Sequence, residues 1–78
     1  MPTIARIGPY RVFFYSNEGY EPPHVHIERD DCVAKFWLES VDLVKNINFK
    51  DHELSEVRRL VVEHQQDWLE EWHEFHRN

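Results

Sequence analysis

Cysteine is almost absent from the sequence, which has Cys32 as its single thiol among 78 residues. A disulfide within the chain is therefore excluded, and because a lone thiol is typical of a reducing compartment, we expect a cytoplasmic protein. The neighbouring Asp30 and Asp31 oppose thiolate formation, which argues against a cysteine nucleophile. Two glycines are too few for a glycine-rich phosphate loop, so no nucleotide cofactor is expected. Apolar runs stay well short of the roughly 20 residues of a membrane-spanning helix, so we expect a soluble protein without a membrane segment.

Positive charge is scarce too. The sequence has 9 Lys and Arg residues against 15 Asp and Glu residues, a formal net charge of -6 with neutral histidines. This charge disfavours a protein that holds a phosphate backbone by bulk electrostatics, so direct nucleic-acid binding is not expected.

The length predicts one domain over residues 1–78, with room for one sheet and one helix. Domains of this size bury only about 60% of the surface that their unfolded chain exposes, and they often depend on a subunit contact. The size therefore favours a protein that works with a partner, either another protein or a second copy of itself.

The first fifty residues predict a small antiparallel sheet of three to four strands. Strand-forming residues or apolar alternation run over residues 4–7, 10–15, 24–29 and 32–38, with a weaker segment at 41–44. The last segment is weak because its alternation breaks at Val44.

A two-residue hairpin loop at Asp30 and Asp31 fixes the register of the two central strands. The pairs that follow are Arg29–Cys32, Glu28–Val33, Ile27–Ala34, His26–Lys35, Val25–Phe36 and His24–Trp37. The apolar faces of the two strands coincide in this register, and a slip by one residue would separate them. We therefore expect the apolar face to meet the helix and the face with the histidines to meet solvent.

From Asp51 onward, apolar residues recur at steps of three and four, which predicts one long amphipathic helix of about residues 51–76 on one face of the sheet. The expected fold class is α+β. A helix of about 25 residues runs close to 40 Å, longer than such a sheet is wide. Trp68, Trp72 and Phe75 lie on its far half, so we expect them to form a partner interface. The alternative is a bent or shorter helix that folds Trp68 and Trp72 back onto the core.

A small group of side chains on the histidine face has the residue types of acid–base chemistry. His24, His26 and Glu28 follow one another at intervals of roughly 7 Å, with Lys35 opposite His26. These four residues are the candidate catalytic group of a metal-independent ribonuclease. His24 and His26 are weaker candidates for a metal site, because they supply half of a zinc ligand set and Lys35 repels a cation. The third interpretation is a solvent-facing polar surface without chemistry.

Three stretches of the chain resemble a bacterial family. They are Glu-Pro-Pro-His-Val-His-Ile-Glu-Arg at 21–29, Ala-Lys-Phe-Trp-Leu-Glu at 34–39, and the helix end with Trp72 and Phe75. The family is domain of unknown function family 4160, and the similarity runs in order over nearly the whole chain. The chain departs from the family at two places. Family members often carry glycine at the turn where this chain has Asp30 and Asp31, and they often carry Gly-Phe-Ser before the helix. This chain therefore lacks a serine cap at the helix start.

The resemblance implies a partner. Family members look like partners of a second small family encoded nearby, domain of unknown function family 2442, and the pairs have been proposed as toxin and antitoxin modules. By this analogy we expect a protein–protein interaction module that acts as the toxin-like component of a two-gene system. The alternatives are the small ribonuclease and the histidine-based metal-binding domain.

Overall fold

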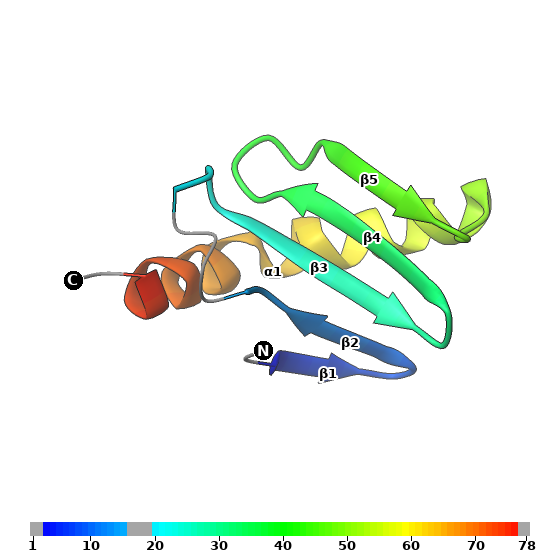
Figure 1. Ribbon diagram of the computed structural model, residues 1–78, viewed down its shortest axis with the longest axis horizontal. Helices are drawn as coiled ribbons and strands as arrows, with labels where there is room; N and C mark the ends of the chain where they lie inside the picture. Colours follow the sequence, from blue (N-terminus) through cyan, green and yellow to red (C-terminus); the bar gives the residue numbers. More distant parts are fainter. Residues whose placement is uncertain (1–2, 16–19, 77–78) are drawn as a thin grey trace.

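The computed structural model describes residues 3–15 and 20–76 (Figure 1). Its elements, in chain order, are β1 (Thr3–Ile7), β2 (Tyr10–Phe13), β3 (His24–Arg29), β4 (Cys32–Trp37), β5 (Leu43–Ile47) and α1 (Asp51–His76). In the described residues the strands form one five-stranded antiparallel sheet in the order β1-β2-β3-β4-β5, and α1 lies across one of its faces. The first two and last two residues of the predicted domain lie outside this description.

The class is α+β as expected, but the expected count of three to four strands is wrong. The segments in question are the two edge strands, β1 and β5. All five residues of β5 are exposed. Because an exposed edge strand buries neither face, it has little of the apolar alternation by which a strand is predicted from sequence.

The central hairpin has the predicted register. β3 pairs with β4 from Arg29↔Cys32 at the turn to His24↔Trp37 at the open end. Asp30, the first residue of the turn, has a φ of 54°. Both mirror-image turns that suit two-residue hairpins require a positive φ there, which aspartate tolerates better than most residues and glycine best.

The last strand contains a β-bulge and begins later in the sequence than predicted. Lys35 pairs with Lys45, whereas the next residue of β4, Phe36, pairs with Leu43, so Val44 is the extra residue. The predicted segment at 41–44 is thus misplaced, because Val41 belongs to the turn before β5. Val41 has a φ of 59° and donates its backbone N–H to the carbonyl of Trp37 at 3.0 Å.

The core lies between α1 and the face of β3 and β4 that it covers. Four side chains of this face (Val25, Ile27, Ala34 and Phe36) and two of α1 (Val57 and Val61) are fully buried. α1 contacts both central strands. The apolar stripe of the helix therefore meets the apolar face that the hairpin register predicts.

Glu53 fixes the start of α1. One of its carboxylate oxygens accepts the backbone N–H of Lys50 at 2.9 Å, and the other accepts Arg29 Nη2 at 2.6 Å. The first bond is half of a capping box, which partly replaces the absent serine cap. The second ties the first turn of α1 to the last residue of β3. These bonds, the one from Lys50 first and then the one from Arg29, lower the pKa of Glu53.

Replacing Phe36 by Ala should lower the free energy of unfolding by about 3 to 5 kcal/mol, because a buried aromatic side chain leaves a cavity. Urea denaturation followed by circular dichroism measures this loss. Phe75→Ala is the matched control, since Phe75 is 44% exposed, and its effect should be less than half as large. Equal losses in the two variants would contradict the position of the core.

The Glu53 carboxylate should make stability depend on pH. Because its pKa is lower in the folded than in the unfolded state, Glu53 stabilises the fold above its unfolded pKa. This contribution is lost as the pH falls from the unfolded value of 4.5 through the lower folded pKa, in the acidic window below about pH 5. Glu53→Gln should therefore be less stable at pH 7 and lose less stability across that window. The exposed Glu63→Gln should keep the wild-type profile, and identical profiles for all three proteins would refute the role of Glu53.

Candidate functional site

The face of the sheet opposite α1, called the outer face below, carries a row of side chains across four strands. Phe13 of β2 pairs with His26 of β3, His26 with Lys35 of β4, and Lys35 with Lys45 of β5. We call His26, Lys35 and Lys45 the basic row. Its members come from three different strands and are brought together only by the register of the sheet.

A hollow of about 360 Å³ opens over the basic row. Its lining consists of Tyr15, His26, Val33, Lys35, Lys45 and Ile47. Tyr15 meets the imidazole of His26 edge to face, with ring centroids 4.9 Å apart. That imidazole also stacks on Phe13, at 5.2 Å between centroids, and the rings of Phe13 and Tyr15 are 5.6 Å apart. Two aromatic rings therefore hold His26 in place beside the two lysines.

The charges in this hollow are unbalanced. Lys35 Nζ donates to Glu21 Oε1 at 2.7 Å and is largely buried. Lys45 is exposed, and it forms no ion pair with any carboxylate of residues 3–15 and 20–76. Like charges directly opposite each other on neighbouring strands are destabilising. The arrangement thus favours an anionic group next to Lys45.

The structure separates the four predicted catalytic residues. His26 and Lys35 lie together in the hollow, as their pairing predicts. Glu28 lies on the next row, where Arg11 Nη1 donates to it at 2.5 Å. His24 is not in the hollow, and the four do not form one acid–base group. What remains in the hollow is an imidazole with two ammonium groups and a phenol, which suits anion binding.

The expectation that His24 faces solvent is wrong. Its side chain is fully buried, with its ring 4.7 Å from that of Trp72 and 5.8 Å from that of Trp37. Its Nδ1 lies 3.0 Å from the carbonyl oxygen of Pro22, to which it donates. The cause is the position of His24 at the first residue of β3, where the far end of α1 reaches past the sheet and covers it.

The expectation that Trp68 and Trp72 lie beyond the reach of this chain is wrong as well. α1 is one continuous helix whose last turns extend past the strands (Figure 1), yet both indoles are only 3% exposed. Phe14, which follows β2, packs on Trp72 at 5.3 Å between rings and on Phe75 at 5.1 Å. Of the three residues predicted to form a partner interface, only Phe75 is substantially exposed.

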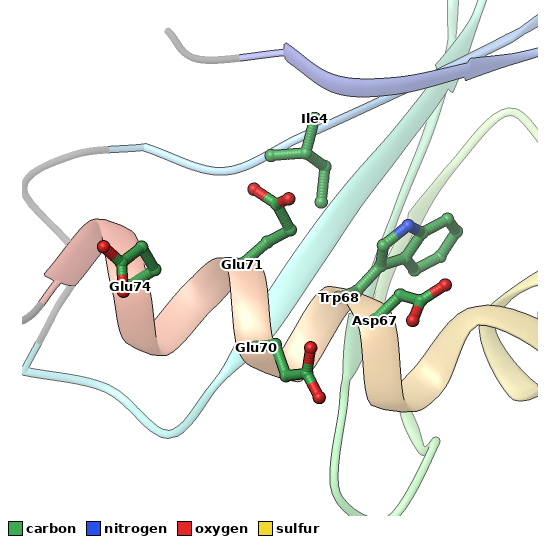
Figure 2. A pocket seen from close by; sticks show the side chains of 6 residues that line it. All are labelled: Ile4, Asp67, Trp68, Glu70, Glu71 and Glu74. Carbon is green, nitrogen blue, oxygen red and sulfur yellow. The ribbon is translucent and has the colours of Figure 1, made fainter.

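Among the residues that the structure describes, a second hollow does not bring ligands together. A hollow of about 520 Å³ between β1 and α1 is lined by Ile4, Asp67, Trp68, Glu70, Glu71 and Glu74 (Figure 2). The carboxylates of Glu70 and Glu71 point to different sides of the helix in Figure 2. Within the described part of the chain, no three His, Cys, Asp or Glu side chains are grouped as a metal ion requires.

The acidic charge of the protein is concentrated on the helix. α1 holds most of the acidic residues of the sequence, and Arg58 and Arg59 are its only Lys or Arg. The basic row lies on the opposite face of the sheet. The net charge of -6 therefore does not describe the outer face.

Cys32 is buried, which is the main reason that its pKa is raised; the charge of Asp31 raises it further. The thiol is thus poorly suited to act as a nucleophile at neutral pH.

Comparison with known proteins places these residues in a family. A family model described as "Domain of unknown function (DUF4160)" matches residues 10–73, from the start of β2 to the last turns of α1. The matched part includes every residue that lines the hollow over the basic row. Neither the curated proteins nor the solved structures that were searched contain a match to the chain.

Burial predicts different effects for the two histidines of β3. His24→Ala should lower the free energy of unfolding by about 1 to 3 kcal/mol, because it removes a buried side chain and leaves the Pro22 carbonyl without its donor. His26→Ala should cost less than about 1 kcal/mol, and the exposed His52→Ala within about 0.5 kcal/mol. Thermal and urea denaturation give the comparison. If His24→Ala left the free energy of unfolding unchanged, the burial of His24 would be contradicted and a solvent-facing side chain supported.

Proposed function

We propose that this chain, which belongs to the DUF4160 family of domains of unknown function, is a protein–protein interaction module that binds a small protein through the outer face of its sheet. One observation carries the proposal: a single helix covers one face of a five-stranded sheet, and no element of residues 3–15 and 20–76 covers the other. Half-covered sheets of this kind are suited to receive a second protein.

Apolar side chains extend this surface to the edge of the sheet. Ile47 of β5 pairs with Val33, lines the hollow and is 42% exposed, whereas Leu43 pairs with Phe36 of the face that α1 covers. Val33 and Tyr15 line the same hollow, so apolar and basic side chains adjoin there, as they do at interaction surfaces. The outer face replaces the far end of α1 as the proposed interface, because Trp68 and Trp72 are already covered.

The resemblance supplies the finer part of the proposal. The partner is a small protein encoded nearby, the pair works in the cytoplasm as a two-gene toxin–antitoxin-type system, and this chain is its toxin-like component. Within residues 3–15 and 20–76, no helix combines the length and the apolar character that spanning a membrane requires.

Binding accounts for the outer face better than catalysis does. Of the predicted acid–base group, Glu28 forms an ion pair with Arg11 and His24 is buried. Neither residue therefore acts with His26 in the hollow as the prediction requires. An assay for RNA cleavage at neutral pH separates the two functions. Cleavage that is lost in His26→Ala, with the fold intact, would favour the ribonuclease instead.

A tagged form of this chain, co-expressed with the untagged product of the adjacent gene, should retain that product on an affinity column. Ile47→Asp should weaken the interaction by at least about tenfold, because it places a charge in the apolar part of the interface. Val62→Asp is the matched control, since Val62 is an exposed aliphatic residue of α1, 56% exposed, and it should bind as the wild type does.

Circular dichroism verifies that both variants are folded, and sedimentation reports self-association. If both variants lost binding equally, the interface would not lie on the outer face. A wild type that retains no product and stays monomeric would end the proposal.

A further inference from the structure

The geometry points to β5 as the edge on which an extended, acid-bearing segment of the partner docks as a sixth strand, with a carboxylate beside Lys45. This inference rests on the proposed function and specifies the chemistry of the partner. It combines three features of the same strand: a free edge, a lysine that forms no ion pair with a carboxylate of the described residues, and the exposed side chain of Ile47.

β5 has a neighbour on one side only. Within residues 3–15 and 20–76, it is the last strand in the sheet order and pairs with β4 alone. All five of its residues are exposed. An edge strand presents a row of unpaired backbone N–H and C=O groups, and extended peptides bind such edges by continuing the sheet.

The register of the sheet predicts where the carboxylate of the partner segment lies. Lys45 ends the row that runs from Phe13 through His26 and Lys35. On a strand added to β5, the residue opposite Lys45 extends this row on the outer face, with its Cβ about 4.5 to 5.5 Å away. A Glu or Asp at that position reaches Lys45 directly. It gives the pair of lysines a second carboxylate, since Glu21 serves Lys35.

The neighbouring residues add an apolar requirement. Ile47 lies two residues beyond Lys45 and lines the same hollow. Because side chains two apart on a strand share a face, the added strand carries an apolar residue two positions from its acid, opposite Ile47. The segment thus alternates an acidic and an apolar residue on the side that faces the hollow.

A peptide fits this edge better than a nucleic acid does. A phosphate backbone is held by several cations along its length, whereas the outer hollow offers Lys35, already paired, and Lys45. The acidic helix behind the sheet repels an extended polyanion. Neither a free strand edge nor the exposed Ile47 contributes to phosphate binding.

Lysines and bulges also protect sheet edges from unwanted pairing. β5 has both, in Lys45 and in the bulge at Val44. If protection were the whole role of Lys45, its loss would cause self-association and would leave peptide binding unchanged or stronger. If Lys45 receives an acidic segment, its loss weakens binding of that segment. The two roles therefore predict opposite results.

The probe is a fluorescein-labelled nonapeptide, Gly-Thr-Val-Thr-Glu-Thr-Val-Thr-Gly, titrated with the full chain and followed by anisotropy. Lys45→Gln should raise its Kd by about two- to fivefold, the range of an exposed ion pair. The control Arg59→Gln removes one positive charge from α1 and should leave the Kd unchanged. The same peptide with Gln for Glu should bind the wild type and Lys45→Gln equally.

Hydrogen exchange supplies a readout on the edge itself. Backbone amides of Leu43–Ile47 should exchange more slowly with the peptide bound, while those of β1, the opposite edge, should not change. A peptide with proline in place of both threonines that flank the glutamate should not bind, because it lacks strand donors.

Three results would overturn the inference: no binding of the peptide, equal binding to wild type and Lys45→Gln, or self-association of Lys45→Gln with undiminished peptide binding. A labelled nine-nucleotide RNA that binds in a Lys45-dependent manner, where the peptide does not, would assign the hollow to phosphate instead. If the wild type retained the adjacent gene product but did not bind the peptide, this docking mode would be rejected. The proposed function would still be supported.

Discussion

A single helix has to cover one face of a five-stranded sheet, and the rest of the structure depends on how that helix is held at its two ends. At the start, Glu53 accepts hydrogen bonds from Lys50 and Arg29 and so joins the first turn to β3. At the far end, Trp72 packs against Phe14 and His24, which come from either side of the β2–β3 connection. Between these anchors, Val57 and Val61 are buried against the central hairpin. The fold is therefore closed along one face without a second helix.

Because the single helix covers only one face of the sheet, the two sides of the molecule differ chemically. The helix carries most of the acidic charge, and the outer face carries the basic row. A chain with a net charge of -6 thus presents a local surface of opposite sign on its uncovered side. Net charge is a sound guide to long-range repulsion of polyanions. It is a poor guide to what one face of a small sheet binds, because the register of the strands decides which side chains gather there.

Sequence reasoning succeeded where local rules act together. The two-residue turn and the apolar alternation both fix the hairpin register, and that register places His26 beside Lys35. It did not find Lys45, because the bulge at Val44 changes which residues of β5 share a face. Nor did it find Tyr15, which lies past the end of β2. Burial of Trp72 was not the preferred prediction for a related reason: its cover, Phe14 and His24, comes from the ends of β2 and β3, which no periodicity links to the helix.

The two histidines of β3 share one face in the register of the hairpin, yet their surroundings differ. The rings of His24 and His26 are 5.3 Å apart, edge to face, yet the first is fully buried against Trp72 and the second lines the outer hollow. Replacing either histidine thus perturbs a different part of the molecule. Loss of function in a His24 variant reports on the packing of α1, because its side chain does not reach the hollow. Only His26 and the lysines beside it report on binding at the outer face, provided that the variant is shown to keep its fold.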